Sequence, residues 1–149
     1  MYRKILVPLD GSELSEAVIP QARMLAQCGG GEILLLRVIV AAPYDYFGAD
    51  VALARSAADS MRTEAQQYLD RMAKYLKLNG VKVSTVLREG AVADSILEYA
   101  ETNLVDLIAM STHGRSGLGR WLIGSVADRV VHGATIPVLL VRPHQNRQA

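Results

Sequence analysis

Residues 105–126 read Val105-Asp106-Leu107-Ile108-Ala109-Met110-Ser111-Thr112-His113-Gly114-Arg115-Ser116-Gly117-Leu118-Gly119-Arg120-Trp121-Leu122-Ile123-Gly124-Ser125-Val126. The stretch begins with an apolar run of strand length, passes through closely spaced glycines and ends where a segment with helical spacing begins. The glycines let the backbone approach a ligand without steric conflict from a Cβ atom. A strand, a glycine-rich loop and a helix in this order are typical of an α/β domain.

The rest of the chain repeats this alternation of strand-like and helical segments. The expected strands cover residues 4–9, 32–40, 81–87, 105–110 and 136–141, and the expected helices cover residues 12–28, 51–78, 91–103 and 125–132. We expect a kink in the first helix at Pro20, because proline clashes with the carbonyl four residues earlier. The pattern predicts a single α/β domain: a five-stranded parallel sheet with helices on both faces.

The composition of the chain argues against binding to nucleic acid or to a membrane. The chain has 149 residues, of which 50% are hydrophobic and 21% charged, and its formal net charge is +1. That balance provides no field to attract nucleic acid or acidic lipid. No apolar run approaches the ~20 residues that cross a bilayer, and the short run after the N-terminus ends at Asp10. We therefore expect a cytoplasmic protein that binds neither nucleic acid nor membrane.

Two loops are expected to meet at one edge of the sheet. In parallel α/β sheets the ligand lies outside the carboxyl ends of the strands, here residues 8–12 and 111–119. Consecutive amides of the glycine-rich loop can form an anion nest, and the helix that begins near Ser125 adds unpaired amides. Arg115 and Arg120 could add charged donors. Together these features predict a polyphosphate site, although the loop matches neither a Walker A sequence nor a dinucleotide fingerprint.

Each of these features also has an interpretation that needs no ligand. The glycine-rich loop could be a tight connection, and Ser125 with Asp128 fits a variant of the capping box. Asp10 could accept a hydrogen bond from a ribose hydroxyl or an adenine amino group. It could instead be a helix N-cap, with Glu13 completing a capping box.

The glycine spacing and its flanking strands resemble the universal stress protein family. The motif of that family is Gly, two residues, Gly, nine residues, Gly, then Ser or Thr. Gly114, Gly124 and Ser125 occupy its last three positions, and Ser111 stands in place of its first glycine. Residues 5–12, 105–110 and 136–141 are similar to the opening strand and the last two strands of the family. The resemblance therefore covers nearly the whole chain.

The resemblance implies an adenine-nucleotide-binding, Rossmann-like domain over residues 1–143, followed by a polar tail over residues 144–149. The implied strand order is 3-2-1-4-5. In the ATP-binding branch the aspartate after the first strand contacts the nucleoside, and the end of the second strand contacts adenine through its backbone. The spaced glycines and the serine hold ribose and phosphates. Carried over, the expected site consists of Pro8, Leu9, Asp10, Val38, Met110, Ser111, His113, Gly114, Arg115, Gly117, Gly124, Ser125 and Val126.

The expected ligand is ATP, although the same loop could hold ADP or AMP. The histidines and the single cysteine show no metal-ligand spacing, which argues against a metal held by the protein. Mg²⁺ could still arrive with the triphosphate and keep most of its waters. Ser111 adds a Cβ atom where the backbone would pass near the ribose, and it can also supply a hydroxyl donor. We expect no metal site built from protein ligands and no catalytic residue.

We expect a dimeric stress-response or regulatory module whose output is nucleotide binding rather than turnover. One alternative is a slow ATPase or self-phosphorylating enzyme, with Ser116 or Ser125 as acceptor. Another is a ligand-free dimeric interaction module. In the implied order the apolar strand over residues 136–141 is a sheet edge, and two-fold pairing would bury it, as the resemblance also implies. The third strand alternates apolar and polar residues, which favours an edge position for it too.

Overall fold

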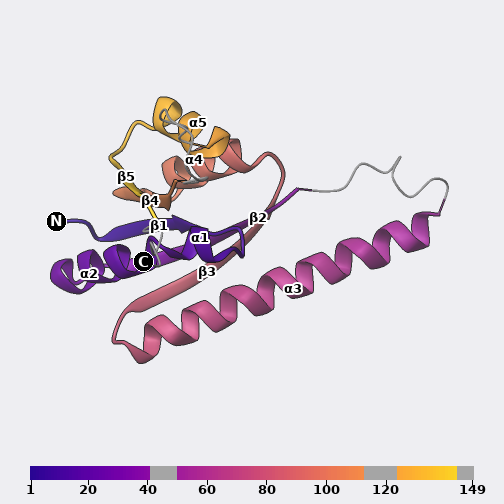
Figure 1. The fold of residues 1–149 in the computed structure, drawn as a ribbon, viewed down its shortest axis with the longest axis horizontal. Coiled ribbons are helices and arrows are strands. Elements are labelled where there is room, and N and C mark those ends of the chain that lie inside the picture. Colours follow the sequence, from indigo (N-terminus) through magenta and orange to yellow (C-terminus); the bar gives the residue numbers. More distant parts are fainter. Residues whose placement is uncertain (41–49, 113–123, 144–149) are drawn as a thin grey trace, which may run out of the picture.

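The computed structural model describes residues 1–40, 50–112 and 124–143. Five strands alternate with helices along the chain (Figure 1). In chain order the elements are β1 (Lys4–Pro8), α1 (Glu13–Glu16), α2 (Ile19–Gly29), β2 (Glu32–Ile39), α3 (Val51–Leu78), β3 (Lys82–Glu89), α4 (Val92–Thr102), β4 (Leu107–Ser111), α5 (Ser125–Gly133) and β5 (Val138–Val141).

The strands form one parallel sheet in the order β3-β2-β1-β4-β5. This confirms the predicted fold class and strand order, with β3 and β5 at the two edges. β1 is central: Ile5 pairs with Ile33 of β2 on one side and with Leu107 of β4 on the other. The carboxyl ends of β1, β2 and β4 therefore lie at the same end of the sheet.

Helices cover both faces of the sheet, and each face has its own core. α2 and α3 lie on one face, and α4 and α5 lie on the other (Figure 1). In β1, Ile5 and Val7 pack toward α2 and α3, while Leu6 packs toward α4 and α5. All three side chains are fully buried. Burial on both faces explains why the central strands are continuous apolar runs rather than alternating ones.

The prediction of one continuous helix over residues 12–28 is wrong. The structure places two helices there, α1 and α2, which are separated at Ala17 and Val18. Pro20 lies in the first turn of α2, where its missing N–H costs no intrahelical hydrogen bond. The proline therefore begins a new helix instead of bending an existing one.

The fifth strand is shorter than predicted. It begins at Val138 rather than at residue 136, because Pro137 stands immediately before it. The Pro137 carbonyl still accepts a hydrogen bond from the Ile108 N–H at 3.1 Å. Because proline has no N–H, Pro137 can accept a hydrogen bond from β4 through its carbonyl but cannot donate one to it.

Asp106 ties the start of β4 to the start of β1. One carboxylate oxygen accepts from the backbone N–H groups of Arg3 at 2.9 Å and Lys4 at 2.8 Å. The Asp106 N–H donates to the Lys4 carbonyl at 2.9 Å. The hydrogen bonds from Lys4 and then Arg3 lower the pKa of Asp106 below its usual value.

We expect Asp106→Ala to lower the free energy of unfolding by about 1 kcal/mol at pH 7, because two charge-assisted hydrogen bonds are lost at an exposed site. The folded-state pKa of Asp106 is depressed, so its contribution is present above the unfolded value of 3.8 and disappears as pH falls through the folded value. Urea unfolding at pH 7 and pH 3 measures this. Glu101→Ala, at an exposed position of α4, is the matched control. A stability difference that stays the same at both pH values would contradict the assignment.

Candidate functional site

A cavity of about 390 Å³ lies at the carboxyl ends of the central strands. Its walls come from the ends of β1, β2 and β4, from α1 and from the amino-terminal turns of α4 and α5. At this end of the sheet the chain leaves β1 toward β2 on one side, whereas β4 lies on the other. This is the topological switch point, where ligands bind in open parallel sheets.

The structure brings most of the predicted site residues together. The cavity is lined by every one of them that lies in the described ranges, namely Pro8, Leu9, Asp10, Val38, Met110, Ser111, Gly124, Ser125 and Val126. His113, Gly114, Arg115 and Gly117 lie outside the described residues, as does Ser116.

Sequence reasoning missed six residues of the lining: Leu14, Ser15, Leu36, Val92, Ile96 and Ala127. Leu36 could have been found, because it lies two residues before Val38 and must therefore face the same side of β2. Val92 and Ile96 lie one helical turn apart at the start of α4, so they share a helix face. Because the predicted helix follows the third strand of a parallel sheet, its first residues must lie at the carboxyl ends of the strands, so these two residues could also have been found.

The β1–α1 connection is held by a short network of hydroxyl and carboxylate bonds. The Asp10 Oδ1 accepts from the Ser12 N–H at 2.8 Å and from the Ser12 hydroxyl at 2.6 Å. The Ser12 Oγ accepts from the Ser15 N–H at 3.1 Å and caps α1. The predicted alternative, with Asp10 as N-cap and Glu13 completing a capping box, is therefore wrong. Asp10 orients the capping serine and also lines the cavity.

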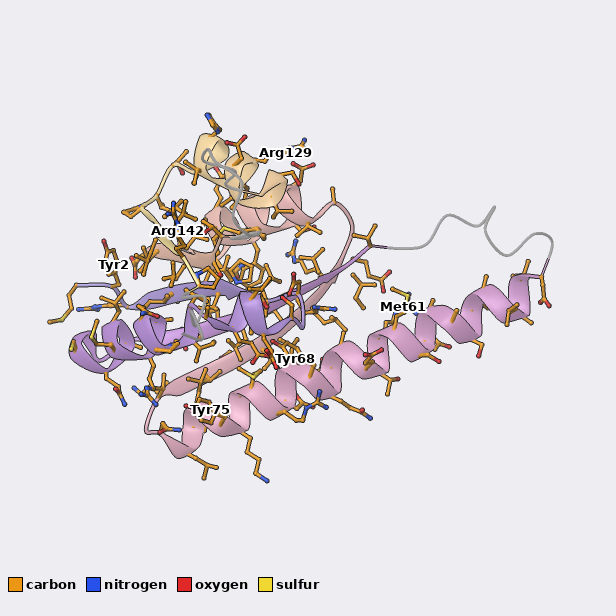
Figure 2. All side chains as sticks on the ribbon, viewed as in Figure 1. Tyr2, Met61, Tyr68, Tyr75, Arg129 and Arg142 are labelled. Carbon is orange, nitrogen blue, oxygen red and sulfur yellow. The ribbon has the colours of Figure 1, made fainter. Side chains whose placement is uncertain are left out.

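Arg37 supports this connection from the opposite face of β2. Its Nη1 lies 3.5 Å from the Leu9 carbonyl oxygen, and its guanidinium lies 5.9 Å from the centre of the Tyr68 ring. The Tyr68 hydroxyl donates to Glu16 at 2.9 Å, and burial followed by this hydrogen bond raises the pKa of Tyr68. Tyr68 lies between α3 and the sheet (Figure 2). α3 therefore contacts Arg37 through Tyr68, and Arg37 in turn supports the β1–α1 connection that carries Asp10.

The first turn of α5 forms the polar end of the cavity. α5 begins at Ser125 with Gly124 as its N-cap, and among the described residues no side chain caps it. The predicted capping box of Ser125 with Asp128 is therefore wrong, since Ser125 is the first helical residue. Uncapped amides at a helix N-terminus carry a partial positive charge and favour an anion. Ser125, Val126 and Ala127 place this terminus in the cavity lining.

The cavity thus has apolar walls and a polar end. Leu36, Val38 and Met110 offer a surface suited to a flat, weakly polar ring. Asp10, Ser111 and Ser125 offer one carboxylate and two hydroxyls. Across the ranges 1–40, 50–112 and 124–143, no three His, Cys, Asp or Glu side chains gather in a way that could hold a metal ion. No helix within those ranges is long and apolar enough to cross a membrane.

A substitution at Gly11 tests whether Arg37 supports the β1–α1 connection. Its φ is +86°, and a Cβ atom built on it would lie 3.0 Å from Nη1 of Arg37. Gly11→Ala should therefore carry the cost of a left-handed backbone, about 1–2 kcal/mol, plus a cost for displacing Arg37. Gly80→Ala is the matched control, because its φ is +75° and nothing lies within 4 Å of its Cβ position.

Urea unfolding of the two variants separates the two costs. We expect Gly11→Ala to be the more destabilising, because only that substitution adds a steric contact to the backbone strain. Equal losses would show that the Arg37 side chain moves away freely and does not hold the connection in place.

Comparison with known proteins gives one consistent result. Residues 1–142 match the sequence profile of the Universal stress protein family. Universal stress protein MJ0531 of Methanocaldococcus jannaschii is 35% identical over 142 residues, which cover 95% of this chain and 83% of that protein. The solved structure of MJ0577 from the same organism superimposes with a TM-score of 0.82 at 29% identity, covering 98% of this chain and 99% of that one.

Two more distant structures share the fold and were solved with ligands. A universal stress protein in complex with cAMP superimposes with a TM-score of 0.69 at 19% identity, covering 96% of this chain and 98% of that one. One from Archaeoglobus fulgidus in complex with dAMP gives a TM-score of 0.70 at 20% identity, covering 93% of this chain and 97% of that one. With the profile match over residues 1–142, the sheet order and the cavity at its switch point, the chain belongs to the universal stress protein family.

Proposed function

We propose that this protein binds an adenine nucleotide, ATP, ADP or AMP, in the cavity at the carboxyl ends of β1, β2 and β4. The observation that carries the proposal is the composition of the cavity, with apolar walls on one side and the N-terminus of α5 on the other. A volume of about 390 Å³ is within the usual range for small-molecule sites. The cAMP and dAMP complexes of related folds support the same class of ligand.

Each part of the nucleotide has a suitable partner in the lining. Val38 and Met110 would contact the base, and the Asp10 carboxylate would accept from a ribose hydroxyl. Phosphates would lie at the N-terminus of α5, near the Ser125 hydroxyl. Gly114 and Gly117 belong to the proposed site by the family motif. Mg²⁺ would accompany the phosphates and keep most of its waters.

We further propose that binding, rather than turnover, is the output. Among the described lining residues, Asp10 is the one ionisable side chain, and it already accepts two hydrogen bonds from Ser12. A phosphoryl-transfer site normally combines positioned charges with a group that orients the nucleophile. In this proposal the protein is a cytoplasmic stress-response module, in which the nucleotide favours one conformation of the chain.

A homodimer formed through β5 is part of the proposal. β5 is a sheet edge of four apolar residues, all of them partly exposed. Ile108 donates to the Pro137 carbonyl and Thr112 donates to the Val141 carbonyl, so alternate residues face β4. In a parallel ladder this leaves the backbone groups of Val138 and Leu140 pointing outward. Two-fold strand pairing would satisfy those groups and cover the edge.

Calorimetric titration of MgATP into the full chain, after removal of any nucleotide that co-purifies, tests the site. We expect saturable binding of one nucleotide per subunit. Asp10→Asn should weaken the binding by about tenfold, because a charge-assisted hydrogen bond to the ribose is lost. The asparagine retains an acceptor for Ser12, so the fold should persist. Asp70→Asn, an exposed carboxylate on α3 outside the cavity, is the matched control.

Three outcomes would contradict this account. No binding by titration and by a second method would favour the ligand-free interaction module. Equal weakening by Asp10→Asn and Asp70→Asn would place the nucleotide elsewhere. Steady phosphate release, or phosphate transfer that Ser125→Ala abolishes, would favour the slow enzyme instead.

Sedimentation of the full chain with and without Leu140→Pro tests the dimer. Proline at an outward-facing edge position removes a donor that the sheet does not use, so the subunit should stay folded. We expect the wild-type protein to be dimeric and the variant to be monomeric. A variant that remains a dimer would show that β5 is not the interface.

A further inference from the structure

The opposite edge of the sheet, β3, is long and unprotected compared with β5. β3 has eight residues paired in unbroken register with β2, and it contains no proline. β5 has four residues and is bracketed by Pro137 and Pro143. Edge strands are usually protected by shortness, proline, bulges or charge. In β3 the five residues between Lys82 and Arg88 are all uncharged.

The alternation of hydrogen bonds between β2 and β3 identifies which backbone N–H and C=O groups of β3 face outward. The Gly90 N–H donates to the Ile39 carbonyl at 3.0 Å, which continues the ladder between β2 and β3. Because bonding residues alternate along a parallel strand, Ser84, Val86 and Arg88 bond to β2. The N–H and C=O groups of Val83 and Thr85 therefore point away from the sheet.

A groove runs beside this part of the edge. α3 and β3 lie side by side (Figure 1), and between them is an open groove of about 590 Å³. The β3 groove is lined by Asp70, Ala73, Lys74, Lys77, Leu78, Val83, Ser84 and Thr85. At the other end of β3, an ion pair between Arg62 and Glu89 joins α3 to the strand. The accessible part of the edge is therefore the amino-terminal half of β3.

Charge in the β3 groove selects the class of partner. Lys74 and Lys77 line the groove against one carboxylate, that of Asp70. Within the described part of the chain, the ion pairs use neither of these lysines. Two cations against one anion favour an acidic ligand at close range.

We propose that the β3 groove binds an extended acidic segment of a partner protein, which adds to the sheet as a further strand. Main-chain hydrogen bonds to Val83 and Thr85 would hold it, as in other cases of strand addition. Alternate side chains of an added strand lie on the same face, so acidic residues at every second position would meet Lys74 and Lys77. The proposal does not depend on nucleotide binding.

A second copy of this chain fits the groove less well. Two-fold pairing of β3 with its own copy would place both α3 helices on the same face of the extended sheet. The Lys74 and Lys77 side chains of both subunits would then approach each other, and like charges in such proximity are destabilising. An acidic strand brings the opposite charge to the same place.

Fluorescence anisotropy with a labelled peptide of about eight residues that alternates glutamate and valine tests the proposal. We expect saturable binding to the full chain that weakens as salt rises, and no binding of the lysine–valine counterpart. Thr85→Pro removes an outward N–H and should weaken binding by about tenfold or more, whereas Thr85→Val keeps that N–H and should bind as the wild type does. Circular dichroism and thermal unfolding check that both variants are folded.

Hydrogen exchange on the complex distinguishes strand addition from simple charge attraction. We expect new protection at the Val83 and Thr85 amides, while the Ser84 amide, already bonded to β2, changes little. The proposal would be overturned by absence of binding, by binding without protection at those amides, or by equal affinity of the Thr85→Pro and Thr85→Val proteins. A dimer that Thr85→Pro dissociates would overturn it in favour of pairing between copies of this chain.

Discussion

The position of β1 between β2 and β4 is the constraint on which the remaining structure depends. β1 is paired on both edges and fully buried on both faces at Ile5, Leu6 and Val7. A shift of one residue would exchange the side chains of β1 between the two cores and disrupt the packing of both. Its carboxyl end is therefore fixed relative to β4, and the loops that follow these two strands face a common cavity. The Asp106 bonds at the amino ends of the same two strands reinforce that alignment.

The cavity depends on supports that do not themselves contact it. Leu36 and Val38 line it, while Arg37 points to the other face of β2 and contacts the β1–α1 connection from behind. The guanidinium of Arg37 lies over the ring of Tyr68 from α3, and the Tyr68 hydroxyl donates a hydrogen bond to Glu16 of α1. α3 thus reaches the cavity wall on one side, and its last turns border the β3 groove on the other. The two candidate sites share a supporting helix but no lining residue.

The fold could be predicted because its signals are strong and local. Continuous apolar runs such as residues 33–36 indicate strands buried on both faces, and their alternation with helices implies a parallel sheet. The described part of the predicted site also came together, because the topology alone places Asp10, Ser111 and Ser125 at one end of the sheet. The errors arose where two local rules compete. Pro20 can kink a helix or begin one, and Asp10 or Ser12 can cap α1. Arg37 could not be found, since its role depends on a tertiary contact with Tyr68.

A crystal structure of the full chain with MgATP would show directly where the nucleotide binds. We expect the base between Val38 and Met110, the ribose within hydrogen-bond distance of Asp10, and phosphate oxygens at the amides that begin α5. Nucleotide bound on another surface, with this cavity left without it at saturating concentration, would show that the cavity is not the nucleotide site.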